Sequence, residues 1–143
     1  MTYDTWKSLP SMFFEIAEQG ADEAFMWKKQ AGSYTPLSWR DTARQVREMA
    51  KGLAALGVTT GDRVVIAAEN RPEWVIADLA IMALGAISVP AYTTNTTRDH
   101  RHVLADCGAK GVIVSTRALA ARLLPAAAET AATEIAVVSL LGM

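Results

Sequence analysis

The sequence has only one cysteine, almost no net charge and no uninterrupted hydrophobic run long enough to cross a bilayer. Cys107 alone cannot form an internal disulfide or a multi-cysteine zinc site, which favours a reducing compartment. A formal net charge of -1 is unlike the concentrated basic surface with which general nucleic-acid binders displace counterions. The longest apolar stretch, Val75 to Tyr92, is interrupted by Asp78, Gly85 and Pro90. We therefore expect no membrane span and no nucleic-acid partner.

The amino-terminal residues lack the features of a secretory signal. Asp4 lies where such a signal is basic, and no apolar run follows within MTYDTWKSLP. The chain of 143 residues is 51% hydrophobic and 20% charged, a balance that predicts one domain with a packed core. We expect a cytoplasmic protein, with a peripheral position at the inner face of the membrane as the second location to consider.

The most informative stretch runs from Gly61 to Thr97, where a strand, a helix and a second strand follow each other closely. Arg63 to Ala68 is a short β-branched run, typical of a strand that is buried on both faces. Pro72 suits the first position of a helix that ends near Leu84 and has only one polar residue after Glu73, so we expect it to be covered on both sides. Ala86 to Val89 supplies the next strand. This spacing predicts a parallel βαβ unit.

The residues before this unit predict two helices and a hairpin. Ser8 to Gln19 has helical spacing of its apolar residues, and Ala24 to Lys29 with Ser33 to Leu37 predicts a hairpin that turns at Gly32. Ser38 caps a helix that runs to about Leu56. Its apolar side is predicted from seven residues: Trp39, Ala43, Val46, Met49, Ala50, Leu53 and Leu56. Its polar side carries a basic stripe, which we interpret as a solvated face: Arg40, Arg44, Arg47 and Lys51.

The residues after the central unit continue the alternation of helices and strands. Thr97 is expected to cap a helix to Asp106, and Gly111 to Ser115 predicts a third strand. A helix over Arg117 to Leu124 is followed by an alanine-rich helix that starts at Pro125, and Glu134 to Leu140 predicts a fourth strand. The fold class is therefore α/β: three layers, with a mostly parallel sheet flanked by helices.

Five residues with metal-binding side chains gather in one segment: Asp99, His100, His102, Asp106 and Cys107. Side chains two positions apart on a helix point about 200° apart, so the two histidines cannot share a metal ion there. Cys107 lacks a neighbouring base that would make it a nucleophile. We interpret the segment as surface histidines and a buried or half-buried thiol, with no metal site.

Two other candidates are also interpreted as structural. The glycine spacing from Gly52 to Gly57 resembles that of a phosphate loop, but it closes a helix instead of opening one and contains no lysine. Asp78, alone in an apolar helix, is expected to be paired internally.

The loop from Tyr92 to Asn95 differs, because it follows a parallel strand at the edge where open α/β sheets bind ligands. Its hydroxyls and amides can contact a nucleotide or an acyl chain, and a purely structural turn is the alternative.

Two separated blocks carry a further signal. The first is YTPLSWR, from Tyr34 to Arg40, directly before a long helix. The second combines GDRV at 61–64, NRPEW at 70–74, ALGA at 83–86 and VP at 89–90. In this order they resemble the adenylate-forming enzymes, the superfamily of acyl-CoA synthetases, peptide-synthetase adenylation domains and luciferases. The pair ENRPEW and VPAYTTNT is most similar to the long-chain fatty acyl-CoA synthetase branch.

The resemblance implies a two-step ligase, in which a fatty acid and MgATP give an acyl-adenylate and pyrophosphate, and coenzyme A then displaces AMP. The family's phosphate loop, ribose-binding acid, magnesium-binding glutamate and catalytic lysine have no counterpart before Met143. The resemblance thus implies an amino-terminal fragment of the large AMP-binding domain, inactive by itself. We assign no catalytic or metal-binding residue, and expect ATP, Mg²⁺ and coenzyme A in the parent enzyme but not bound to the fragment. By analogy, Tyr92, Thr93 and Thr94 border the nucleotide end of coenzyme A.

Within such a fragment, residues 1–37 would form a lid helix with the small hairpin, and residues 38–143 the long helix with the βαβ units. Two alternatives stay open: a free-standing α/β binding or interaction module, and a fragment of another adenylate-forming enzyme. Because the helix from Pro72 to Leu84 lacks a polar face, we also expect apolar surface that the rest of the enzyme would cover, and hence self-association.

Overall fold

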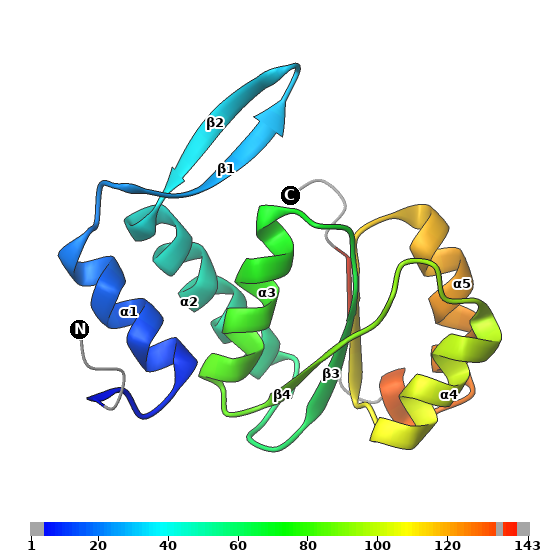
Figure 1. Cartoon of the computed structure of the whole chain (residues 1–143). Coiled ribbons are helices and arrows are strands. Elements are labelled where there is room, and N and C mark those ends of the chain that lie inside the picture. The colour runs from blue at the N-terminus through cyan, green and yellow to red at the C-terminus, as the bar shows by residue number, and fades with distance from the viewer. Residues whose placement is uncertain (1–4, 134–135, 140–143) are drawn as a thin grey trace.

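The structure is a computed structural model that describes residues 5–133 and 136–139. Its centre is a parallel sheet with the strand order β4-β3-β5-β6 (Figure 1). The strands are β3 (Arg63–Ala67), β4 (Ile87–Pro90), β5 (Gly111–Val114) and β6 (Ala136–Ser139). The predicted fourth strand is thus present within 134–140, and the rest of that range lies outside the described residues. The register pairs Val65 of the central strand with Val89 on one side and Val112 on the other.

Helices cover both faces of the sheet and complete the three layers (Figure 1). One side holds α2 (Trp39–Ala55) and α3 (Pro72–Ala83), with α1 (Leu9–Gln19) packed against them. The other side holds α4 (Thr97–Cys107), α5 (Arg117–Ala128) and the short 3-10 helix Ala131–Thr133. Alternate residues of β3 enter the two cores: Val64 and Ile66 the first, Val65 and Ala67 the second. The predicted α/β fold class is confirmed.

The central helix α3 has no solvated face, as its sequence predicts. From Pro72 to Ala83 every residue except Ala83 is buried or half-buried. Asp78 corrects one expectation, because its side chain is half-buried and makes no ion pair with any described residue. Its carboxylate can reach water, so burial does not force it to find an internal partner. Among the described residues, no helix is long and apolar enough to span a bilayer.

The hairpin forms a separate two-stranded sheet that projects from the helical body (Figure 1). Its strands are β1 (Ala24–Gln30) and β2 (Ser33–Ser38). The two-residue turn has φ of 47° at Ala31 and 84° at Gly32. Two successive positive φ angles match the turn type whose twist suits an antiparallel hairpin, so Gly32 has the predicted role.

Two helix boundaries and the burial of one side chain differ from the expectation. Thr96, not Thr97, caps α4, because Thr96 and Asp99 form a reciprocal capping box. Pro125 does not start a second helix but lies inside α5. It is exposed there, as is Ala121, whose carbonyl would have received the missing amide and can bind water instead. Leu56, expected on the apolar side of α2, is instead 51% exposed.

Candidate functional site

The carboxyl ends of β3 and β4 lie side by side and open into a groove of about 590 Å³. The groove is lined by the last residue of β4, by the residues that follow the two strands and by one α3 residue: Ala68, Glu69, Asn70, Trp74, Pro90, Ala91, Tyr92 and Thr93. Tyr92 is 81% exposed. The loop from Tyr92 to Asn95 therefore occupies the edge of the sheet that the sequence predicts, where parallel sheets place their ligands.

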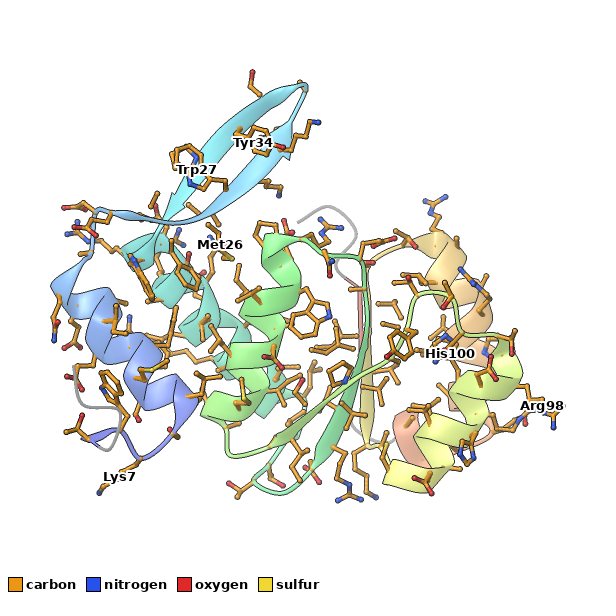
Figure 2. The ribbon with its side chains drawn as sticks, viewed as in Figure 1. Lys7, Met26, Trp27, Tyr34, Arg98 and His100 are labelled. Atoms are coloured by element: carbon orange, nitrogen blue, oxygen red, sulfur yellow. The ribbon has the colours of Figure 1, made fainter. Side chains whose placement is uncertain are left out.

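A second groove of about 550 Å³ is also lined by Tyr92. It is lined by the same loop and the first two turns of α4: Tyr92, Asn95, Arg98, Asp99, His102 and Val103. Arg98 and His102 are exposed and lie four positions apart, on one side of the helix. Arg98 points away from the body in Figure 2. Tyr92 thus lines two grooves, and Arg98 and Asp99 place one cation and one anion at the second.

Two acidic side chains near the carboxyl end of the sheet, Glu69 and Glu73, bind other side chains. The carboxylate of Glu69 accepts a very short hydrogen bond from the Ser115 hydroxyl, which joins the residues that follow β3 and β5. This hydrogen bond lowers the pKa of Glu69. The end of the sheet is therefore fixed by a side-chain contact between neighbouring strands.

Glu73 lies in the first turn of α3, and its side chain is only 5% exposed. It accepts hydrogen bonds from Arg71 Nε at 2.8 Å and from Lys28 Nζ of the hairpin. Burial by itself would raise the pKa of Glu73, but the two cationic donors outweigh it and lower the pKa to about 2. Sequence spacing could place Glu73 at a helix start but could not show that Lys28, 45 residues away, binds it. This network fastens the hairpin to α3.

The prediction that both histidines lie on the surface is right for His102 and wrong for His100. His102 is exposed, but His100 is fully buried, and neither of its ring nitrogens has a partner among the described residues. Burial lowers the pKa of His100, and the nearby Arg122 guanidinium lowers it further against the opposing effect of Asp99. The signal for burial is Leu104, which lies four residues on and faces the same core.

The five residues with metal-binding side chains, which we interpret as forming no metal site, do not converge in the structure. His100 faces the interior while His102 faces solvent, as their helical spacing predicts. Within the described part of the chain, no group of three or more His, Cys, Asp or Glu side chains could hold a metal ion. Cys107 is half-buried, as expected, and burial raises the pKa of its thiol.

At the opposite end of the sheet, Arg63 binds the backbone. Its guanidinium donates to the carbonyls of Cys107 at 2.7 Å, Gly108 at 2.8 Å and Gly61 at 3.1 Å. Gly108 ends α4 in the left-handed conformation with φ of 59°, and a Cβ atom there would lie 2.8 Å from Arg63 Nη2. Arg63 therefore joins the start of β3 to the end of α4.

Comparison with known proteins identifies the family of this fold. The AMP-binding enzyme family matches residues 13–142, which is nearly the whole chain, so the protein belongs to that family of adenylate-forming ligases. The family resemblance seen in the sequence blocks is thereby confirmed.

Individual relatives differ in their substrates. The long-chain-fatty-acid–CoA ligase FadD15 of Mycobacterium tuberculosis is 38% identical over 109 residues, which cover 76% of this chain and 18% of that enzyme. The acetyl-coenzyme A synthetase of Nitrosomonas europaea is 34% identical over 70% of this chain and 15% of its own length. The N-terminal subdomain of Klebsiella oxytoca NpsA, solved with 3-hydroxybenzoyl-AMSN, has a TM-score of 0.74 at 26% identity, and the match covers 94% of this chain and 30% of that one. The chain thus spans less than a third of each.

Proposed function

We propose that this chain is the amino-terminal part of a long-chain fatty acid–CoA ligase that forms AMP. The parent enzyme would join a fatty acid to ATP, release pyrophosphate, and transfer the acyl group from AMP to coenzyme A. The similarity to FadD15 supports the long-chain assignment, together with the ENRPEW and VPAYTTNT segments. Residues 1–37 would act as a lid element and residues 38–143 as the helix and βαβ part of the large domain.

The site proposed within this chain is the loop Tyr92, Thr93 and Thr94, which would border the nucleotide end of coenzyme A. Its support is geometric: the loop follows β4 at the carboxyl edge of the sheet, and Tyr92 exposes most of its ring beside two grooves. An exposed aromatic ring can stack on a purine, and threonine hydroxyls can donate to a phosphate oxygen and can donate to or accept from a ribose hydroxyl. ATP and Mg²⁺ would bind the rest of the enzyme.

Two tests address this function. A phosphate-binding loop encoded beyond Met143 would support the ligase, whereas a stop codon at that point would favour a free-standing module. The product of the whole coding sequence should release AMP when it receives MgATP, coenzyme A and a long-chain fatty acid, and more slowly with acetate or an aryl acid. Faster turnover of acetate would instead favour the alternative of another adenylate-forming ligase, as the acetyl-coenzyme A synthetase relative illustrates.

The 143-residue chain by itself should form no acyl-CoA, and acyl-CoA formation at ordinary enzyme rates would overturn the proposal of an inert fragment. The expected apolar surface does not lie on α3, because this chain itself covers that helix. We further propose that the isolated chain self-associates through the edge strand β4, where Ile87 is 50% exposed, and that the parent enzyme covers this surface. Sedimentation that shows a monomer at high concentration would contradict self-association. We propose a cytoplasmic location for the parent enzyme.

A further inference from the structure

The site groove, which lies at the carboxyl ends of β3 and β4, shares two lining residues with a groove beside the hairpin. Asn70 and Trp74 line both grooves. The groove beside the hairpin has a volume of about 630 Å³ and is also lined by Met26, which Figure 2 shows at the base of the hairpin, toward the helices. The segment from Asn70 to Trp74 therefore forms a wall that the candidate site and the hairpin have in common.

Two cations hold this wall through one carboxylate. Lys28 of β1 donates to one oxygen of Glu73, and Arg71 Nε donates to the other at 2.8 Å. The Glu73 side chain is 5% exposed, whereas both cations are half-buried. A carboxylate that is buried to this degree keeps its place only while cations or hydrogen-bond donors compensate its lost hydration. The hairpin therefore contributes directly to the position of the first turn of α3.

The same interactions continue to the ends of two strands. The Ser115 hydroxyl donates to Glu69 and lowers the pKa of that carboxyl against the opposing effect of burial, and the positive charge of Arg71 lowers it further. Glu69 itself lines the site groove. We call this set the polar network, which runs from the hairpin through the start of α3 to the ends of β3 and β5: Lys28, Glu73, Arg71, Glu69 and Ser115.

We propose that Lys28 is a positioning residue for the site groove, which it does not itself line. Lys28 acts through Glu73, whose carboxylate it draws toward the hairpin. Without Lys28, Glu73 retains the Arg71 guanidinium, and the pair can turn toward solvent to regain hydration. Because Trp74 directly follows Glu73 and lines the groove, its ring moves with that turn of α3. That the groove receives the nucleotide end of coenzyme A rests on the proposed function.

The alternative is a purely local role, in which Lys28 fastens the hairpin and leaves the groove unchanged. Lys29 offers a matched control, because it is the next residue of β1 and faces the other side of the strand. It is exposed, and its Nζ lies 5.8 Å from the centre of the Tyr34 ring. Lys29→Met therefore removes the same charge from the same hairpin without touching the polar network.

Backbone amide chemical shifts of the 143-residue chain test the positioning without any ligand. Lys28→Met should shift the amide resonances of Glu69 and of Ser115, at the far end of the polar network, whereas Lys29→Met should leave both near their wild-type values. Lys28→Arg restores a cation and should return the shifts most of the way. If folded Lys28→Met changes only the resonances of the hairpin and of Glu73, the role is local and the proposal is overturned.

The parent enzyme, expressed from the whole coding sequence, tests the effect on the site. Lys28→Met should raise the KM for coenzyme A about fivefold, at the lower end of typical couplings between separate sites, and leave pyrophosphate exchange at the wild-type rate. Lys28→Arg should restore most of the KM, and Lys29→Met should leave both quantities unchanged. A local role would lower the free energy of unfolding of Lys28→Met without moving this KM, and that result would contradict the proposal.

The two experiments separate failure of this inference from failure of the proposed function. Lys28→Met keeps Arg71 on the Glu73 carboxylate, so we expect it to fold, and circular dichroism checks this. If it does not fold, Lys28→Gln, which keeps a donor without the charge, replaces it in both experiments. A parent enzyme that forms no acyl-CoA would reject the ligase, and the amide shifts would still decide whether Lys28 positions the groove. An active parent whose KM for coenzyme A does not respond to Lys28→Met would reject the positioning role alone.

Discussion

The two ends of the parallel sheet use their polar side chains differently. At the amino end, Arg63 donates to three backbone carbonyls and joins β3 to the end of α4. At the carboxyl end, acidic groups such as Glu69 and Glu73 bind other side chains, and Tyr92 is exposed between two grooves. Backbone carbonyls cannot change partners without unfolding a turn, whereas the exposed side chain of Tyr92 can rearrange around a ligand. The amino end is therefore suited to stability and the carboxyl end to binding.

The largest expected loss of stability follows removal of Arg63. The change Arg63→Met deletes three hydrogen bonds from a charged donor and should lower the free energy of unfolding by about 3 kcal/mol in urea melts. The matched control Arg98→Met, at the carboxyl end, removes an exposed guanidinium and should change the same quantity by less than about 0.5 kcal/mol. Equal losses for both variants would remove the distinction between the two ends.

Glu73 is the carboxyl-end residue with the largest expected effect. Glu73→Gln leaves Lys28 and Arg71 without their anion and should cost about 2 kcal/mol, reduced from a fully buried pair because both cations are partly exposed. Its folded-state pKa of about 2 is below the ordinary 4.5, so its contribution is complete above pH 4.5 and disappears as the pH falls toward 2.

Urea melts across that pH range provide the measurement. The difference in unfolding free energy between wild type and Glu73→Gln should shrink as the pH falls from 4.5 toward 2. A difference that is constant with pH would show that the charge of Glu73 does not cause the stabilisation.

His100 should give a smaller effect of opposite sign. His100→Leu removes two buried nitrogens that have no partner in the described structure, and should raise the free energy of unfolding by about 1 kcal/mol. Because the pKa of His100 is lowered from 6.5 in the folded state, its ring takes up a proton more readily in the unfolded chain than in the folded one. The free energy of unfolding of wild type should therefore fall as the pH drops below 6.5.

Thermal melts across this range should show a weaker acid dependence in His100→Leu than in wild type. His102→Leu is the matched control, because His102 is exposed on the same helix, and it should keep the wild-type dependence. If His100→Leu is less stable than wild type, the ring contributes more by packing than its buried nitrogens cost.

The central fold was predictable because β3, α3 and β4 carry strong and consistent local signals. β-branched runs bounded by turn residues and an apolar helix started by Pro72 leave few alternatives. Contacts between distant residues were not predictable. The hydrogen bond from Lys28 to Glu73 spans 45 residues, and no local pattern encodes it. His100 was misplaced because polar residues surround it in the sequence, although helical spacing puts it beside Leu104 in the core.

The sequence predicted where on the sheet the loop of the candidate site lies, but not the grooves that border this loop. That Tyr92 follows a parallel strand could be inferred from the βαβ spacing, and the structure adds the two grooves that it lines. The interpretation of Asp78 as internally paired failed because composition shows that a helix is apolar but not which side chains reach water. Pro125 was expected to begin a helix, yet an exposed proline is tolerated inside α5.

The most direct measurement uses the enzyme expressed from the whole coding sequence with the substitution Tyr92→Ala. It measures the two half-reactions, adenylation of the acid and transfer to coenzyme A, separately. Loss of the exposed ring should change stability by less than about 0.5 kcal/mol and leave pyrophosphate exchange at the wild-type rate, while the KM for coenzyme A rises about tenfold. An unchanged KM for coenzyme A, or an equal fall in pyrophosphate exchange and acyl-CoA formation, would contradict the assignment of the carboxyl end to coenzyme A.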